Sequence, residues 1–298
     1  MVEEADFAEA AKKVQPSGRR EGFAEVPTTS WADVGALETA KRELTRRVVE
    51  PVKHAALFAA AGVERAAGVL LHGPPGCGKT LLAKAVARES GANFIAVKGP
   101  ELLSKYVGES ERAVRTVFAR ARSAAPCVIF FDELDALCPR RDAESGAGGG
   151  SQVTERVVNT LLVEIAGLEE RSGVFLIAAT NRLDILDPAM LRPGRLETHL
   201  YIGLPDAPAR LRILRTLARD RPLATRVDLQ AIAERSPGLS GADLAALFKE
   251  AALLALQDIL SQPAAAGAGA GAVAAGGLCI DMRHFEEALR LVKPSVRP

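Results

Sequence analysis

The sequence predicts an α/β fold, in which a parallel sheet carries helices on both faces and is followed by a small all-α domain. Three observations predict it. Apolar runs of strand length alternate with helical stretches between residues 69 and 202. A glycine-rich loop at residues 73–80 joins the first apolar run directly to a helix-forming run. From about residue 205 onward the apolar residues recur at helical spacing.

The composition excludes several classes of protein. A chain of 298 residues is long enough for one large domain and a smaller one. Apolar residues make up 48% of it and aromatic residues only 4%, which favours helix-rich packing over a β-sandwich. A net charge of +1 gives no reason to expect direct, sequence-specific nucleic-acid binding or a membrane partner. No apolar run approaches the length of a membrane span, and the acidic start is not a signal peptide.

The cysteines give no sign of a metal site. All four, namely Cys77, Cys127, Cys138 and Cys279, are too scattered for metal-ligand spacing. We expect reduced thiols in a cytosolic or nuclear protein.

The first 30 residues contain part of an internal repeat. Residues 6–17 align with residues 284–295, and both segments end in a Pro-Ser pair. We therefore expect residues 1–17 to be the end of an upstream copy of the same module, with residues 18–30 as a linker. The chain would then be the second half of a tandem protein. The alternative is a chance agreement between two amphipathic helices.

The next segment is predicted to be helical. Residues 31–35 indicate a short turn, residues 37–50 a charged helix that stops at Pro51, and residues 53–61 a second helical stretch.

The glycine-rich loop is predicted to bind phosphate. Glycines let consecutive backbone N–H groups turn toward an anion, and the following helix N-terminus adds partial positive charge. Lys79 would reach the β- and γ-phosphates, and the Thr80 hydroxyl would hold Mg²⁺. The loop therefore predicts a P-loop NTPase sheet; the alternative is a plain strand-to-helix connection.

A second strand and a helix follow. Residues 93–97 form the strand, and residues 110–125 carry apolar side chains at helical spacing (Val114, Val117, Phe118 and Ala121). The arginines of this helix are interpreted as a solvated or subunit-facing surface.

The next strand ends in a carboxylate pair. Residues 127–131 are apolar without interruption, which is typical of a parallel strand buried on both faces, and Asp132 and Glu133 follow. Asp132 would hold the Mg²⁺ water shell, and Glu133 would orient and polarise the attacking water. The alternative is an acidic pair that only caps the strand.

The remaining strands complete the sheet. Residues 174–179 form a buried strand that ends in Thr180 and Asn181, whose amide could hold the γ-phosphate or the water, and residues 198–202 form the last strand. The ligand is expected at the carboxyl edge of these strands.

The rest of the chain is predicted to be an all-α domain, residues 205–298, after a large domain at residues 31–204. Ser240 to Asp243 indicates a capping box that opens a long helix. Residues 263–277 are a low-complexity Ala/Gly insertion, and residues 281–292 form the last helix.

These motifs together resemble the AAA ATPases, over residues 31–294. Residues 73–80 resemble the Walker A motif of that family, residues 128–133 its Walker B motif, Asn181 its sensor 1 and residues 191–195 its second region of homology. Four stretches of the sequence are most similar to the second ATPase domain of the nuclear valosin-containing-protein-like ATPases. They are the loop, G-P-P-G-C-G-K-T, and residues 98–103, 106–112 and 135–141.

The resemblance implies a homo-hexameric ring that binds ATP and Mg²⁺ at each subunit boundary. Arg192 and Arg195 match the positions that act on the γ-phosphate of the neighbouring subunit. The alternative is that these arginines pair with a local acid such as Glu197.

The resemblance also implies the nucleotide contacts. Asp33, Val34 and Gly35 match the adenine-side turn, and Ile213, Gly241 and Ala242 match contacts from the lid. The loop contacts are Pro74, Pro75, Gly76, Cys77, Gly78, Lys79, Thr80 and Leu81.

Other positions match parts of the ring that act on clients. Tyr106 and Val107 match the first pore loop, which grips a polypeptide in the channel; a core tyrosine is the alternative. Residues 146–150 lie where a second pore loop or a surface loop is expected. Ala166 stands where the family usually has Asp in the element that signals between subunits.

Function is therefore expected to be ATP-driven remodelling of protein clients threaded through the pore. By resemblance these are pre-60S ribosomal particles in the nucleolus of the nucleus; otherwise the protein is cytosolic. Two alternatives remain. One is a GTPase, because residues 181–184 faintly match a guanine-reading motif, and the other is a nucleotide-binding scaffold without turnover.

Overall fold

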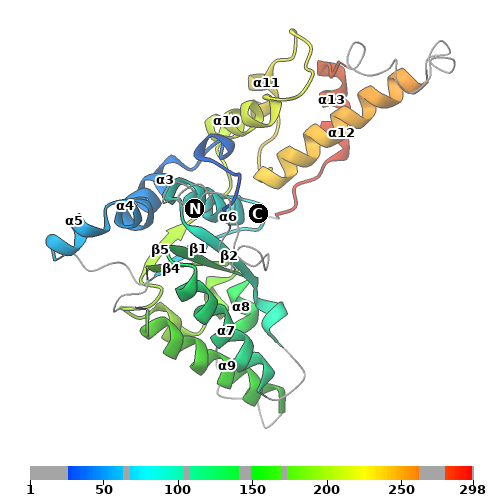
Figure 1. Ribbon diagram of the computed structural model, residues 1–298. Coiled ribbons are helices and arrows are strands. Elements are labelled where there is room, and N and C mark those ends of the chain that lie inside the picture. Colours follow the sequence, from blue (N-terminus) through cyan, green and yellow to red (C-terminus); the bar gives the residue numbers. More distant parts are fainter. Residues whose placement is uncertain are drawn as a thin grey trace, which may run out of the picture. The chain divides into compact units, whose positions relative to one another are not determined.

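The computed structural model describes residues 26–62, 68–103, 108–140, 149–168, 173–261 and 279–296. Its contacts divide the chain into two compact units. The first, here called the sheet unit, contains residues 41–72 and 80–201. The second, the helical unit, contains residues 31–40, 73–79 and 202–298. Figure 1 labels the helices and strands of both.

The sheet unit is built on five parallel strands in the order β2-β3-β4-β1-β5. Their bounds are β1 Gly68–His72, β2 Asn93–Lys98, β3 Cys127–Asp132, β4 Val174–Thr180 and β5 Thr198–Tyr201. The central strands are uninterrupted apolar runs because both of their faces are covered. This arrangement confirms the predicted parallel sheet.

Helices cover both faces of this sheet, as the strand order requires. The chain passes from β1 to the far edge through α6 (Lys79–Ser90) and then returns stepwise through α7 (Glu109–Ser123) and α9 (Gly149–Ala166). Right-handed crossovers in opposite directions place α6 on one face and the packed pair α7 and α9 on the other (Figure 1).

The helix α9 is a feature that the sequence analysis did not identify. It follows α8 (Leu134–Leu137) and already includes Gly149 and Gly150, which were expected in a loop. The rest of that glycine run lies outside the described residues.

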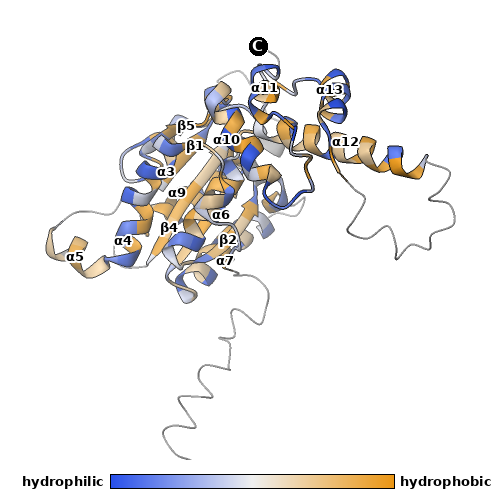
Figure 2. Cartoon of the chain, turned by 90° about the horizontal axis from the view of Figure 1, so that it is seen from above, coloured by the Kyte–Doolittle hydropathy of each residue, from blue (hydrophilic) through white to orange (hydrophobic). Residues whose placement is uncertain are grey.

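The core of the sheet unit lies between the strands and these helices. Leu70, Phe118 and Phe131 are almost completely buried, and the last two stack with ring centroids 6.1 Å apart. Figure 2 shows the strands mostly in orange, the colour of hydrophobic residues.

One predicted helix end is wrong. The chain does not stop being helical at Pro51, which lies in the first turn of α4 (Glu50–Lys53). The preceding helix α3 (Glu38–Leu44) passes into a π-helical turn η2 (Thr45–Val49), and α4 continues from it. A proline is tolerated in a first helical turn because the N–H that it lacks needs no intrahelical partner there. The short helix α5 (Ala55–Ala60) follows.

The helical unit contains α10 (Ala207–Ala218), α11 (Leu229–Glu234), α12 (Gly241–Leu260) and α13 (Met282–Leu291). The predicted capping box of Ser240 and Asp243 opens α12 and is confirmed. Phe248 and Phe285 meet edge to face with centroids 5.0 Å apart and join α12 to α13. The Ala/Gly insertion lies outside the described residues.

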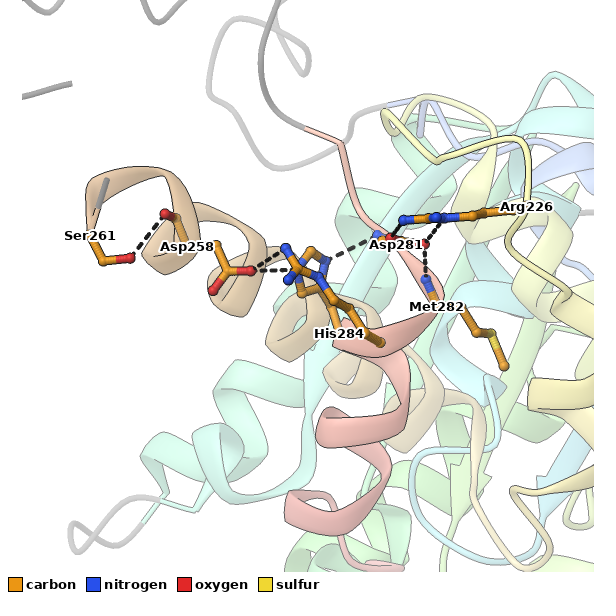
Figure 3. Close-up of polar contacts among 7 residues, drawn as sticks. Arg226, Asp258, Ser261, Asp281, Met282 and His284 are labelled. Carbon is orange, nitrogen blue, oxygen red and sulfur yellow. Dashed lines mark hydrogen bonds and ion pairs between the residues drawn. The ribbon is translucent and has the colours of Figure 1, made fainter. Parts of the chain in front are cut away.

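A polar network fixes the start of α13 (Figure 3). The Asp281 backbone N–H donates to His284 Nδ1 at 3.0 Å, so Nδ1 is the acceptor nitrogen of the ring. His284 Nε2 therefore carries the proton and donates to Asp258 Oδ2 on α12, also at 3.0 Å. Arg226 forms an ion pair with the Asp281 carboxylate. His284 is only 4% exposed, so this is a buried cap.

Among the helices of the described residues, none combines the length and apolar character needed to cross a membrane.

Candidate functional site

The phosphate-binding loop is held together by its own lysine. Lys79 is buried, and its ammonium group donates to the carbonyl oxygens of Gly73 at 2.7 Å and Pro74 at 2.8 Å. Gly76 and Gly78 have positive φ angles of 74° and 94°, which L side chains rarely adopt. The loop thus has the glycine conformations that turn backbone N–H groups toward an anion.

The predicted adenine-side turn contacts the predicted lid residue. The turn follows η1 (Trp31–Asp33), and Val34 is buried. A Cβ on Gly35 would lie 2.7 Å from the Cα of Ile213 and 2.8 Å from the carbonyl oxygen of Arg212, so only glycine fits against α10. Arg219, the residue directly after α10, donates to the Ala32 carbonyl oxygen at 3.0 Å. The structure therefore brings Gly35 and Ile213 together.

The start of α12 contacts the phosphate-binding loop. The Ala242 N–H donates to the Gly76 carbonyl oxygen at 3.0 Å. A Cβ on Gly241 would lie 3.2 Å from that same oxygen, and a Cβ on Gly76 would lie 2.8 Å from Ser240 Oγ. The predicted lid contacts Gly241 and Ala242 therefore adjoin the loop.

Cys77 in this loop is a neutral thiol. Burial raises its pKa above the ordinary value, the nearby Lys79 ammonium group lowers it, and the Asp243 carboxylate raises it further. Its Sγ lies 3.7 Å from the Pro75 carbonyl oxygen. The thiol acts as a small packing group of the loop.

The two predicted metal-binding residues meet directly in the sheet unit. Thr80 Oγ1 donates to Asp132 Oδ2 at 2.8 Å, although the residues are 52 positions apart in the chain. Both side chains present oxygen atoms, the ligand type that Mg²⁺ prefers, and Mg²⁺ commonly takes one or two protein oxygens together with substrate phosphates. The pair therefore fits the expected ion.

Glu133 adopts a strained backbone conformation just after β3. Its φ is 54° and its ψ is 49°, the left-handed region, which costs a non-glycine residue about 1–2 kcal/mol. Gly99, at the start of η3 (Gly99–Leu102), lies against the Glu133 carbonyl oxygen so closely that a Cβ would collide with it. Glu133 is thus fixed by a close approach between two loops at the carboxyl edge of the sheet.

Asn181 follows the strand that lies between β3 and β1. The preceding Thr180 is buried, and its hydroxyl donates to Asp135 Oδ1 at 2.7 Å and accepts from the Arg182 N–H at 3.0 Å. The position of Asn181 is therefore coupled to α8, which directly follows Glu133. Arg182 pairs with Asp184 at the surface.

The two predicted arginine fingers differ in their contacts. Arg195 Nη1 donates at 2.6 Å to the carbonyl oxygen of Ala189, which lies in the short helix η5 (Pro188–Leu191), whereas Arg192 is exposed. Glu197, the acid considered as a local partner, accepts from the Gly194 N–H at 3.3 Å. No ion pair joins either arginine to a carboxylate within the described ranges.

Some predicted residues are not placed at this site by any described contact. Tyr106 and Val107 lie outside the described residues, and Leu81 is a partly exposed residue of α6. Conversely, sequence reasoning gave no role to Gly99 or Asp135. The local sequences G-P-E at residues 99–101 and D-A-L at residues 135–137 were the only available indications, because the contact partners of Gly99 and Asp135 are distant in the chain.

Family models match both units. The model of the "ATPase family associated with various cellular activities (AAA)" matches residues 69–204, and the model of the "AAA+ lid domain" matches residues 226–265.

Similar proteins come from an archaeon, a mammal and a yeast. The chain is 54% identical to the Cell division cycle protein 48 homolog of Archaeoglobus fulgidus, over 99% of this chain and 39% of that protein. It is 54% identical to Nuclear valosin-containing protein-like of Mus musculus, over 99% of this chain and 34% of that protein. It is 50% identical to Ribosome biogenesis ATPase RIX7 of Saccharomyces cerevisiae, over 98% of this chain and 36% of that protein.

The chain thus spans between 34% and 39% of the length of these three relatives. The two family models together match residues in both units, in the order expected for an ATPase domain and its lid. We conclude that the chain belongs to the AAA ATPase family and carries an ATPase domain followed by the lid of that family.

Proposed function

We propose that this protein hydrolyses ATP and uses the energy to remodel protein clients as a homo-hexameric ring. The observation that carries the proposal is the direct hydrogen bond between Thr80 and Asp132 at 2.8 Å. It joins the end of the phosphate-binding loop to the carboxylate of the last residue of a buried strand, as a Mg²⁺-dependent phosphoryl-transfer site needs.

The loop residues hold the triphosphate in this proposal. Backbone N–H groups of residues 76–81 surround the phosphates, and Lys79 exchanges its loop carbonyl partners for phosphate oxygens. Asp33, Val34, Gly35, Ile213, Gly241 and Ala242 enclose the adenosine. Thr80 and Asp132 would hold Mg²⁺, which supplies charge neutralisation on the phosphates.

Glu133 is the proposed base. It accepts a proton from the attacking water as the water oxygen bonds to the γ-phosphorus and the bond to the ADP oxygen breaks. The strained backbone of Glu133 fixes the direction of its carboxylate. Asn181 orients the γ-phosphate or the water through its side-chain amide.

The ring is proposed from the arginines. Arg192 and Arg195 would act on the γ-phosphate of the neighbouring subunit, a contribution of about 10³- to 10⁵-fold in rate for arginine fingers. Arg192 is exposed and Arg195 is fixed by the Ala189 carbonyl oxygen, so both could serve a nucleotide outside their own chain.

The client and the location are proposed from the relatives. One relative carries the name ribosome biogenesis ATPase and another the name nuclear valosin-containing protein-like. We propose that this chain extracts factors from pre-60S particles in the nucleolus, with Tyr106 and Val107 gripping the client in the pore. In this proposal residues 31–204 are the large ATPase domain, residues 205–298 the lid, and residues 1–30 the end of an upstream module with its linker.

The test is Glu133→Gln in the longest natural form of the protein. The amide keeps the size of the side chain but cannot accept the proton, so ATP should bind normally while turnover falls about 10²- to 10⁴-fold. Glu101→Gln, a change of the same kind on η3, is the control and should keep full turnover. Affinity capture with the Glu133→Gln protein would then identify the client.

The alternatives give different results. For a scaffold without turnover, Glu133→Gln would change nothing measurable. A GTPase would prefer guanine nucleotides. The match of residues 69–204 to a family of ATPases disfavours this alternative. Tyr106→Ala should keep ATPase activity and lose remodelling; full remodelling by that variant would contradict the pore role.

A further inference from the structure

The Asp243 carboxylate is the centre of an unusual hydrogen-bond arrangement in the helical unit. Its Oδ2 atom accepts from the Ser240 N–H at 2.9 Å, and the Asp243 N–H donates to Ser240 Oγ at 3.2 Å; these two bonds are the capping box of α12. Oδ2 also accepts from Ser240 Oγ at 2.8 Å. The same oxygen also accepts from the Ser295 N–H at 3.3 Å and from Ser295 Oγ at 3.0 Å. Ser295 follows α13 and is 52 residues away in the chain. One oxygen thus ties the chain after α13 to the first turn of α12.

This tie involves the residues that flank the lid residues in contact with the phosphate-binding loop. Gly241 and Ala242 lie between Ser240 and Asp243, and the Ala242 N–H donates to the Gly76 carbonyl oxygen at 3.0 Å. Ser240 is completely buried and Asp243 is 7% exposed, so this part of the helix start has little freedom. A shift of Asp243 would move the Ala242 N–H relative to the loop.

The ionised state of Asp243 matches this arrangement. Burial raises the pKa of its carboxyl group, but the hydrogen bonds from Ser240 and Ser295 outweigh burial, and the pKa is lower than usual. Hydrogen bonds to a charged acceptor are about twice as strong as those between neutral groups. Loss of the Ser295 bonds therefore removes two of the four charge-assisted hydrogen bonds to this oxygen.

The sequence repeat points to the same serine. The Pro-Ser pair at the end of the repeat is Pro294-Ser295 in the second copy. Proline limits the backbone of the segment that carries Ser295 to Asp243. The structure therefore gives the second Pro-Ser pair a contact that the proposed hydrolysis did not use.

We propose that Ser295 is a positioning residue for the nucleotide: it holds Asp243, which fixes the Gly241–Ala242 contact on the phosphate-binding loop. This inference rests on the proposed function, because it requires that the loop binds ATP. Ser295 touches no substrate in this proposal and acts through Asp243 alone. Removal of its hydroxyl should weaken nucleotide binding more than the chemical step.

The experiment compares variants at Ser295 in the full chain. Ser295→Ala removes the hydroxyl bond and should raise the Kd for a fluorescent ADP analogue and the KM for ATP about three- to tenfold, with kcat changed less than twofold. Ser295→Thr keeps the hydroxyl and should restore both values. Ser295→Asp places a second carboxylate beside Asp243 and should raise the Kd further than Ser295→Ala.

The matched control lies at the other end of the same helix. Ser261 caps the end of α12 and donates to the Asp258 carbonyl oxygen at 3.0 Å without contacting Asp243. Ser261→Ala and Ser261→Asp should leave the Kd and the KM unchanged. Circular dichroism and thermal unfolding without nucleotide identify any variant that fails to fold.

Two results overturn the inference. If folded Ser295→Ala and Ser295→Asp bind ADP as tightly as the natural protein, Ser295 does not position the loop. If Ser295→Ala lowers kcat with KM unchanged, its role lies elsewhere. Failure of the proposed function looks different, because the unsubstituted chain would then bind no nucleotide and Lys79→Ala would have no effect.

Discussion

Glu133 shows how a single glycine can fix the backbone that carries a proposed catalytic side chain. Gly99 lies against the Glu133 carbonyl oxygen, and Glu133 has a φ of 54°. A side chain at position 99 would push the Glu133 backbone out of its place, because the colliding atom is a backbone oxygen that cannot rotate away.

We therefore expect Gly99→Ala to reduce kcat about 10²-fold while ATP still binds, since small misplacements of a reacting group cost about that much. Steady-state ATPase assays and equilibrium binding of an ATP analogue measure the two effects. Gly91→Ala is the control: Gly91, unlike Gly99, has a positive φ of +67°, but an added Cβ there meets no atom within 4 Å. A Gly99→Ala protein with normal kcat would contradict the role of this contact.

The buried thiols give a pH prediction. Burial raises the pKa of Cys127 from 9.0 to about 12 and that of Cys138 further, with the Asp187 carboxylate adding to the effect at Cys138. In the unfolded chain these thiols lose their protons near their ordinary pKa. At pH values above that pKa, the unfolded state therefore binds fewer protons than the folded state. Stability contributed by the neutral thiols is complete below pH 9 and falls as the pH rises toward 12.

Two measurements check this prediction. Urea unfolding followed between pH 7 and pH 10.5 should show a steeper fall in unfolding free energy for the natural protein than for Cys127→Ala/Cys138→Ala. With a thiol reagent at neutral pH, exposed Cys279 should react first, and the other three cysteines only after unfolding.

At the scale of elements, the cap of α13 depends on one nitrogen atom. His284 Nδ1 accepts from the buried Asp281 N–H, and Nε2 donates to Asp258. His284→Ala leaves a buried donor without its partner, and we expect a loss of about 1–3 kcal/mol in the stability of the helical unit.

The change can be followed at one site. The single tryptophan, Trp31, lies in the helical unit, so its fluorescence during urea unfolding reports on that unit. Arg226→Ala is the control, because it removes an ion pair whose arginine is 76% exposed, and such pairs contribute at most about 1 kcal/mol. Equal losses of unfolding free energy for both variants would show that the imidazole cap contributes no more to stability than the exposed ion pair.

The elements also show what the sequence could and could not predict. All five strands were predicted, and the central ones were the clearest because a parallel strand covered on both faces must be an apolar run of limited length. The helix α9 was missed because Gly149 and Gly150 open it, and glycines suggest a loop. The end at Pro51 was misplaced because a proline that stops one helix also fits the first turn of the next.

The same distinction holds for the site. Lys79, Thr80, Asp132 and Glu133 could be proposed from the sequence because the expected chemistry follows from residue type and local spacing. The contacts of Gly99 with Glu133, Thr180 with Asp135 and Ser295 with Asp243 join distant positions. No local pattern encodes such contacts, since they arise only when the strands and helices have packed.

At the scale of the whole molecule, the ring makes a prediction about mixtures. Arg195→Ala chains lack the proposed finger, and Lys79→Ala chains lack the lysine that holds the phosphates. Each alone should be nearly inactive. In a random ring of equal amounts, roughly a quarter of the boundaries unite an intact Lys79 with a neighbour's intact Arg195, so about that share of the activity should return.

The control replaces one partner by a chain that carries both substitutions. Mixed with Arg195→Ala, it offers no boundary with both intact groups, so no activity should return. ATPase rates of refolded or co-expressed mixtures provide the measurement. Activity that fails to return in the first mixture would argue that Arg195 acts within its own chain.

The cap of α13 has a practical consequence. Asp258 near the end of α12 contacts Arg283 and His284 at the start of α13, so the described residues that flank residues 262–278 lie near one another. Since doubling the length of a flexible connection costs only about 0.6 kcal/mol, a fluorescent reporter or an affinity peptide spliced in between these flanking residues should leave folding and ATP turnover intact. The protein thus offers an internal labelling position that spares both chain ends.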